Sequence, residues 1–235
     1  YLQQIASHLN TSKAHGQDGW DEAELRLLPR EFWTLASQFY VLVEELGRWP
    51  SPIRGAVVAL IPKAGATEPK DMRDIMLLSM HYRIWAAVRR PIVDQWESQV
   101  AAHHLGGPVY ENAAAAAYSL SFQAEMASAT EQHLAAIFLD CTKAFDSIDR
   151  GFLVQAALRA GFPVPLFAHI MDVFSGPRRI RTQGAVPQPI YAKFGIMPGC
   201  SHAMALLHAV LSPAVAEARA RSAVACRKLA DDLVI

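Results

Sequence analysis

The sequence predicts an α+β fold, in which long helices pack together with a few short strands. Three observations support this fold class. Apolar residues recur at three- and four-residue steps over long stretches, short apolar runs are bounded by turn residues, and 52% of the 235 residues are hydrophobic against 19% charged. This balance is typical of a globular chain rather than a disordered one. The length allows one large domain or two closely packed ones.

Helical periodicity covers six parts of the chain. The first is residues 21–47, where Pro29 is expected to break or start a helix and Gly47 to end one. The other five helices are expected at residues 80–103, 113 to about 132, 150–160, 164–175 and 203–220. Five tryptophans fall on this spacing or beside turns and are predicted to pack in the core rather than stack on bases: Trp20, Trp33, Trp49, Trp85 and Trp96.

Short apolar runs predict the strands. Residues 56–61 and 75–78 are separated by a loop containing Pro62, Gly65 and Pro69, so these two runs are expected to pair with each other. Further strands are expected at residues 134–139, 180–182, 190–194 and 222–229.

Composition excludes several classes of protein and leaves others open. Lysine plus arginine equals aspartate plus glutamate at 22 each, so the sequence lacks the basic excess typical of phosphate binders, although a local basic channel remains compatible with it. The three cysteines form no CxxC pair and the nine histidines show no metal-ligand spacing, so neither a disulfide framework nor a zinc site is indicated. No apolar run reaches membrane-spanning length, and no membrane partner is expected. The chain begins without methionine and stops within an expected strand, so we expect it to be part of a longer protein.

Aspartates follow two of the expected buried strands. Asp140 comes directly after the run at residues 134–139, and Asp231 and Asp232 follow the run at residues 222–229. Carboxylates at adjacent strand ends can hold two Mg²⁺ ions about 3.5–4 Å apart, because Mg²⁺ prefers hard oxygen ligands. A single aspartate is more often a turn residue or a helix cap, so this interpretation depends on the blocks that surround the three aspartates.

Sequence blocks surround these aspartates in a fixed order. The two acidic blocks and the glycine-containing block between them are Ile137-Phe138-Leu139-Asp140-Cys141-Thr142-Lys143-Ala144-Phe145-Asp146-Ser147-Ile148-Asp149, Phe194-Gly195-Ile196-Met197-Pro198-Gly199-Cys200-Ser201 and Leu229-Ala230-Asp231-Asp232-Leu233. The upstream blocks are Asp18-Gly19-Trp20, Gly47-Arg48-Trp49-Pro50, Leu60-Ile61-Pro62-Lys63, Arg73-Asp74-Ile75-Met76-Leu77-Leu78-Ser79 and Tyr82-Arg83-Ile84-Trp85. In this order the blocks resemble those of reverse transcriptases of the non-LTR, LINE-type retrotransposon family, and the resemblance covers nearly the whole chain.

The resemblance implies a right-hand polymerase fold and an RNA-directed DNA polymerase activity. It implies fingers with an N-terminal helical extension at residues 1–133 and a palm at residues 134–235. The palm's antiparallel sheet would pack on helices, and the thumb would be absent. Its implied partners are an RNA template, a DNA primer and deoxynucleoside triphosphates (dNTPs). A thumb and an endonuclease would belong to the parent polyprotein. The sequence leaves the location in the cell open, and intracellular, nuclear activity would be compatible with a retrotransposon.

The same resemblance assigns the catalytic and metal-binding residues. Asp140, Asp231 and Asp232 would be catalytic and would hold two Mg²⁺ ions, with Mn²⁺ as the alternative ion. The backbone carbonyl of Cys141 would lie near one of the ions.

Four further residues would bind the dNTP. Lys63 and Arg73 would contact the triphosphate, Arg as a bidentate group and Lys as a point charge. Phe145 would lie under the sugar and exclude a 2′-hydroxyl, and Gly199, together with Gly195, would let the backbone approach the nucleotide and template.

Four positions depart from the family pattern. Pro198 replaces a Gln, Asp74 replaces a Pro, Leu229 replaces a Tyr, and Tyr110-Glu111-Asn112 stands where Gly-Phe-Arg is usual. These departures favour one alternative, a catalytically decayed remnant that at most binds nucleic acid. A second alternative is another palm-fold enzyme, an RNA-dependent RNA polymerase or a nucleotidyl cyclase. Phe145 argues against an RNA product, and the upstream blocks argue against a cyclase.

Arg178, Arg179 and Arg181 form the strongest basic cluster. They are candidates for contact with the primer–template backbone. The interpretation that the sequence favours is a solvated strand face.

Overall fold

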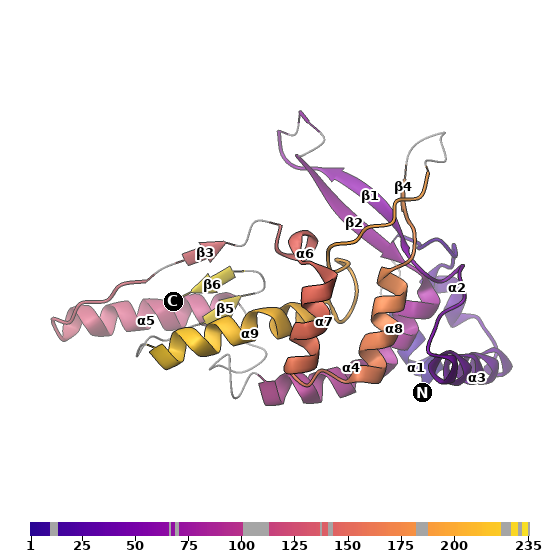
Figure 1. The fold of residues 1–235 in the computed structure, drawn as a ribbon, viewed down its shortest axis with the longest axis horizontal. Helices are drawn as coiled ribbons and strands as arrows, with labels where there is room; N and C mark the ends of the chain where they lie inside the picture. The colour runs from indigo at the N-terminus through magenta and orange to yellow at the C-terminus, as the bar shows by residue number, and fades with distance from the viewer. Residues whose placement is uncertain are drawn as a thin grey trace.

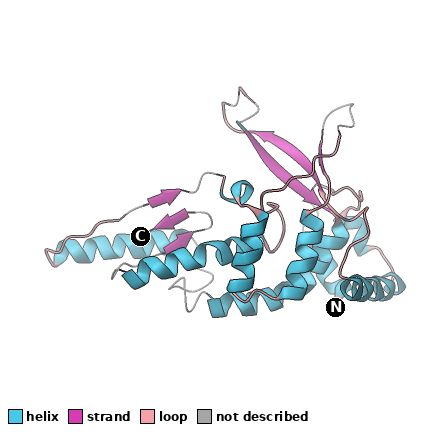
Figure 2. Cartoon of the chain, in the orientation of Figure 1, coloured by secondary structure: helices cyan, strands magenta, loops and turns pink. Residues whose placement is uncertain are grey.

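The computed structural model describes residues 1–9, 14–65, 67–68, 71–100, 113–136, 138–140, 143–181, 188–221, 227–229 and 232–234, with the backbone alone for residues 113, 115, 116, 138–140, 218, 219, 227–229 and 232–234. Its elements, drawn in Figures 1 and 2, are α1 Leu2–Ser7, α2 Glu22–Arg26, α3 Arg30–Leu46, β1 Ala56–Pro62, β2 Met72–Leu78, α4 Met80–Val100, α5 Ala113–Ala129, β3 Phe138–Asp140, α6 Ala144–Ser147, α7 Arg150–Arg159, α8 Val164–Phe174, β4 Arg178–Ile180, α9 Ala203–Arg221, β5 Arg227–Leu229 and β6 Asp232–Val234. Figure 1 shows two small sheets set apart on a layer of helices, with α6 between them. The predicted α+β class is confirmed.

The helices near the N-terminus start and stop where local chemistry predicts. Asp21 caps α2 in a capping box, since its carboxylate accepts from the Ala23 N–H at 2.7 Å while Glu24 reaches back to the Asp21 N–H at 3.1 Å. Pro29 is the N-cap of α3, and Gly47 ends α3 in the left-handed region with φ of 66°. Both expectations for residues 21–47 are therefore confirmed.

The first sheet has the strand order β2-β1-β4. β1 and β2 form the predicted antiparallel pair, with Ala56 opposite Leu78, and β4 adds a parallel strand that begins with Arg178 opposite Ala56. Gly55 (φ of 86°) permits this junction, because a Cβ there would lie 2.0 Å from the Pro177 carbonyl oxygen. β4, which follows residue 134 in the sequence, thus pairs with the hairpin formed by the N-terminal half. The domain boundary expected between residues 133 and 134 remains a prediction.

The core is built around aromatic side chains carried by α3, α4 and the turn that follows α3. Trp49 and Trp85 meet edge to face at 5.5 Å between ring centroids, and Tyr82 stacks on Trp85 at 5.8 Å. Such rings bury large apolar areas and prefer these arrangements. Trp33 and Trp96 are also buried, and the partly buried Trp20 packs against the same core, so the packing role predicted for all five tryptophans is confirmed.

The second sheet has the order β3-β6-β5 and is antiparallel throughout. It lies against α5 through β5 (Figure 1). The strand predicted at residues 134–139 is confirmed only at its end, because β3 covers residues 138–140. The strand predicted at residues 222–229 is observed at residues 227–229, and residues 222–226 lie outside the described part. In the parts of the chain that the structure describes, no helix combines the length and apolar character needed to cross a membrane.

Candidate active site

Two of the three predicted catalytic aspartates, Asp140 and Asp232, lie on the second sheet. Asp140 ends β3, and its Cα partner on the antiparallel strand β6 is Asp232. Asp232 also pairs with Leu229 on β5. In the sequence, Asp231 therefore lies in the short connection between β5 and β6, which pair with each other. Asp231 and Cys141 themselves lie outside the described residues. Among the described residues there is no group of three or more His, Cys, Asp or Glu side chains that could hold a metal ion.

A cavity of about 700 Å³, here called the central cavity, lies between the β1–β2 hairpin, α6 and the loop that precedes α9. Its lining includes Lys143, three residues after Asp140 in the sequence. The residues that line it are Leu60, Lys63, Met72, Arg73, Asp74, Ile75, Lys143, Ala144, Phe145, Asp146, Pro198 and Gly199. All four residues predicted to bind a nucleotide are in this set, and so are two of the departures from the family pattern, at residues 74 and 198.

The α6 wall starts with a residue in an unusual conformation. Lys143 is the N-cap of α6 and has φ of 50°, in the left-handed region that a non-glycine residue rarely adopts. Its carbonyl accepts from the N–H groups of Asp146 at 2.9 Å and Ser147 at 3.0 Å, which holds the turn. Strain of this kind costs about 1–3 kcal/mol and persists where surrounding contacts enforce it, often beside a functional site. Lys143 and Asp146 were not predicted as site residues, although both lie in the first acidic block.

The loop of residues 194–201, here called the pocket loop, adjoins α6 in the wall of the central cavity. Its N-terminal half is tied to α6, because the Gly195 N–H donates to the Ile148 carbonyl at 2.7 Å and the Ile196 N–H donates to the Phe145 carbonyl at 2.8 Å. A Cβ at residue 195, where φ is 88°, would lie 3.2 Å from the backbone of α6. The pocket loop and α6 therefore form a continuous wall.

Gly199 brings the pocket loop against β2. Its φ is 95°, and a Cβ there would lie 2.8 Å from the Met76 carbonyl oxygen. Only glycine combines this dihedral with this approach at no steric cost. Pro198, immediately before it, also lines the central cavity and contributes neither an amide side chain nor a backbone N–H.

The central cavity carries charges of both signs. Lys63, Arg73 and Lys143 supply three cations, all exposed, and none of them forms an ion pair with a described residue. Asp74 and Asp146 supply two carboxylates. Burial, and secondarily the charge of Asp74, raises the pKa of Asp146. The cavity is thus positive by one charge when both carboxylates are ionised.

Arg178 lies behind the central cavity rather than on a solvated face. It is half-buried, and burial lowers its pKa from the ordinary value. Burial and the neighbouring Arg178 also lower the pKa of Arg150 to about 10. Both guanidinium groups donate to carbonyls of residues 194–195, each at 3.3 Å. The solvated-face interpretation is therefore wrong for Arg178 and confirmed for Arg179 and Arg181, which are exposed.

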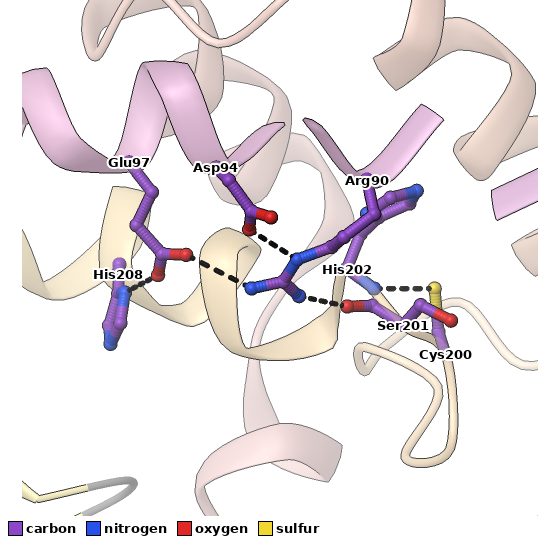
Figure 3. Close-up of polar contacts among 7 residues, drawn as sticks. All are labelled: Arg90, Asp94, Glu97, Cys200, Ser201, His202 and His208. Atoms are coloured by element: carbon purple, nitrogen blue, oxygen red, sulfur yellow. Dashed lines mark hydrogen bonds and ion pairs between the residues drawn. The ribbon is translucent and has the colours of Figure 1, made fainter. Parts of the chain in front are cut away.

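A polar network holds the C-terminal end of the pocket loop (Figure 3). The Arg90 guanidinium of α4 donates to the Ser201 carbonyl at 2.6 Å, to the Asp94 carboxylate, and to Glu97 Oε2 at 3.4 Å. The other oxygen of Glu97 is bound to His208 Nδ1 of α9. This network was not predicted from the sequence, although a signal for it exists, because residues 90, 94 and 97 follow helical spacing on one face of α4.

The end of the pocket loop is buried in the core beside this network. The Tyr82 hydroxyl and the Cys200 thiol are 3.1 Å apart, and the His202 N–H donates to the Cys200 sulfur at 3.4 Å. His202 is fully buried against the edge of Trp85, and burial lowers its pKa to about 4. Neither ring nitrogen of His202 has a hydrogen-bond partner among the described residues.

Comparison with known families identifies the class of protein. The profile of the family described as reverse transcriptase (RNA-dependent DNA polymerase) matches residues 61–235. This range includes the last two residues of β1, every residue that lines the central cavity except Leu60, and both acidic blocks. The chain therefore belongs to the reverse transcriptase family, as its sequence blocks predicted.

Solved structures show the same fold. The apo telomerase of Candida tropicalis, truncated from its C-terminal domain, matches with a TM-score of 0.54 and 13% identity over 87% of this chain and 48% of that chain. Telomerase of the same organism in complex with the TWJ fragment of telomeric RNA matches with a TM-score of 0.54 and 12% identity over 86% of this chain and 39% of that chain. The chain thus spans less than half the length of these structures. At this identity the likeness concerns the fold, and it confirms the predicted polymerase fold.

Proposed function

We propose that this chain forms the fingers and most of the palm of a retrotransposon reverse transcriptase, and that it binds the incoming dNTP in the central cavity. The observation that carries the proposal is the meeting of Lys63, Arg73, Phe145 and Gly199, from separate segments, around one cavity of about 700 Å³. A cavity of this size is within the range of small-molecule sites.

The cations of the central cavity suit a triphosphate. Lys63, Arg73 and Lys143 make no ion pair with described residues, so their donors are available to phosphate oxygens. Arg73 would bind two oxygens at once, while the two lysines would act as point charges. The net positive charge of the cavity would attract the triphosphate.

Phe145 would lie under the sugar. Its ring is half-buried and packs against the core, which limits its movement, and it also lines the central cavity. A fixed aromatic ring beside C2′ would exclude a 2′-hydroxyl and so select deoxynucleotides.

The aspartate pair fits a divalent metal site. The register that sets Asp140 opposite Asp232 places two acidic residues at paired positions of adjacent strands, and Asp231 follows β5 in the sequence. Two Mg²⁺ ions bound there would lower the pKa of the primer 3′-hydroxyl and stabilise the pyrophosphate leaving group. Asp140, Asp231, Asp232 and the Cys141 carbonyl would hold them. An RNA template and a DNA primer would be the partners.

A second candidate function is a decayed reverse transcriptase that binds nucleic acid without catalysis. The observation that favours it is that Asp74 and Pro198 both line the central cavity, so these departures would touch the nucleotide itself. One adds a negative charge near the triphosphate, and the other removes an amide and an N–H donor.

Nucleotide binding tests the proposal on the chain itself. The dissociation constant of dATP with Mg²⁺ is measured by equilibrium dialysis for the wild type, Lys63→Ala and Lys193→Ala. Because Lys63 lines the cavity and the exposed Lys193 does not, we expect a roughly tenfold loss of affinity for the first variant only. Equal losses in both variants, or no binding by the wild type, would contradict the assignment.

Primer extension separates the two candidate functions. Given an RNA template, a DNA primer, Mg²⁺ and dNTPs, the proposed polymerase extends the primer and Asp231→Asn abolishes the extension. A wild type that binds dATP and duplex but never extends is the result expected of the decayed protein. In an active protein, Phe145→Ala should admit ribonucleotides, and unchanged discrimination would remove the sugar-selecting role of Phe145.

A further inference from the structure

The pocket loop closes tightly just after Gly199. The Cys200 N–H donates to the Met197 carbonyl at 3.2 Å, and the Ala203 N–H donates to the Cys200 carbonyl at 3.0 Å. The first bond closes a turn that contains Gly199, and the second closes the next turn, which contains Ser201. A displacement of Ser201 is therefore passed to Gly199, which lies against β2 at the edge of the central cavity.

Arg90 binds this turn through the Ser201 carbonyl (Figure 3). Its Nη1 donates to the Ser201 carbonyl at 2.6 Å, which is a short, charge-assisted hydrogen bond. Arg90 is on α4, a 21-residue helix whose Tyr82 and Trp85 are fully buried. The loop is thereby tied to one of the best-packed elements of the fold.

Two carboxylates fix the direction in which Arg90 points. Asp94 accepts from its Nε and Glu97 from its Nη2 at 3.4 Å. The Glu97 side chain is only 4% exposed and is bound on its other oxygen by His208. Water therefore has little access to the Glu97 end of the network, whereas the Arg90 and Asp94 side chains are 33% and 34% exposed. The planar guanidinium satisfies three acceptors in three directions, which a lysine ammonium on a flexible stem does not reproduce.

We propose that Arg90 is a positioning residue for the nucleotide site, resting on the dNTP-binding function proposed above. By holding the Ser201 carbonyl, it sets the turn that carries Pro198 and Gly199 into the central cavity. Arg90 does not line the cavity and touches no substrate. Its contribution to binding acts wholly through the pocket loop.

A neighbouring arginine provides a matched control. Arg89 is also on α4 and is also half-buried, but it binds Glu44 of α3 through Nε and Nη2, each at 2.7 Å, instead of the pocket loop. Arg89→Lys and Arg90→Lys are the same chemical change on the same helix. A general loss of stability in α4 would affect both variants, whereas a positioning role belongs to Arg90 alone.

The test compares dATP binding with Mg²⁺ in the wild type, Arg90→Lys, Arg89→Lys and the milder Asp94→Asn. Loss of one charge-assisted bond predicts a dissociation constant that is roughly tenfold larger for Arg90→Lys. For Arg89→Lys the dissociation constant should rise about twofold or less. Asp94→Asn keeps the hydrogen bond from Arg90 to Ser201 but weakens the contact that orients the Arg90 side chain. The dATP affinity of this variant should therefore lie between those of Arg90→Lys and Arg89→Lys. If Arg90→Lys binds dATP as tightly as Arg89→Lys does, the proposal is overturned.

Hydrogen exchange gives a second readout that needs no nucleotide. The amides of Cys200, Ala203 and Leu206 donate to the carbonyls of Met197, Cys200 and His202 and so close the successive turns that precede and follow Ser201. They should exchange about tenfold faster in Arg90→Lys than in Arg89→Lys. If the wild type binds no dATP, the proposed function is wrong. Hydrogen exchange would then still test whether Arg90 positions the pocket loop. Unchanged exchange at these three amides would overturn the positioning role, and faster exchange confined to them would support it.

Discussion

Acidification should destabilise this protein through one buried histidine. His202 is fully buried at the start of α9, and burial, with a smaller contribution from Arg90, lowers its pKa from 6.5 to about 4, while Glu97 acts in the opposite direction. In the unfolded chain the same imidazole has its ordinary pKa. Below pH 6.5 the unfolded state therefore binds a proton that the folded state does not, and the free energy of unfolding falls until the pH reaches about 4.

The size of this loss follows from the two pKa values. Each pH unit in the window between them costs about 1.4 kcal/mol for one group. Going from pH 7 to pH 5 crosses about one and a half of these units, so His202 alone should remove about 2 kcal/mol of stability. This is a large share of the roughly 5–15 kcal/mol that holds a typical domain together.

Urea unfolding at pH 7 and pH 5 measures the effect in the wild type, His202→Leu and His133→Leu. Leucine is close to histidine in volume and does not titrate, so His202→Leu should lose about 2 kcal/mol less than the wild type between the two pH values. Other titrating groups contribute equally to both proteins and cancel. His133 is exposed, so His133→Leu should lose as much as the wild type. If His202→Leu proves equally acid-sensitive, the buried neutral imidazole is not the cause and the reasoning is refuted.

Three further changes have expected outcomes. Gly199→Ala should destabilise the fold by about 1–3 kcal/mol in urea unfolding, because its φ of 95° and the Met76 oxygen 2.8 Å from a Cβ both oppose a side chain; an unchanged midpoint would contradict this. Asp74→Asn should tighten dATP binding about threefold by removing one negative charge from the central cavity, and weaker binding would mean that the carboxylate helps to hold the nucleotide. Trp85→Ala should cost about 3–5 kcal/mol, since it empties the centre of the aromatic core and removes the 2.7 Å hydrogen bond to Glu44. A thermal or urea measurement showing less than about 1 kcal/mol would mean that this core repacks.

Local signals predicted most helix ends and the hairpin. Pro29 and Gly47 bound α3 because the ring of proline and the missing side chain of glycine act on their own residues, whatever surrounds them. The pairing of residues 56–61 with 75–78 follows in the same way from two apolar runs joined by a short loop.

Contacts between distant segments were not predictable from such signals. The parallel pairing of β4 with β1 depends on where α7 and α8 return the chain, and this pairing half-buries Arg178 while Arg179 stays exposed. The strand expected at residues 134–139 is observed only at residues 138–140, where β6 is available to pair with it. An apolar run becomes a strand only where a partner supplies its hydrogen bonds.

The sequence by itself determined the family, the helical framework and the identity of the candidate site residues, because motif order and periodicity are properties of the chain. Only the tertiary structure decided that Lys63, Arg73, Phe145 and Gly199 border one cavity, and that Asp140 pairs in register with Asp232. It also decided that Arg90 forms a hydrogen bond with the Ser201 carbonyl of the pocket loop. The reason is physical: side chains far apart in sequence meet only when packing closes the loops between them, and that closure depends on the whole fold.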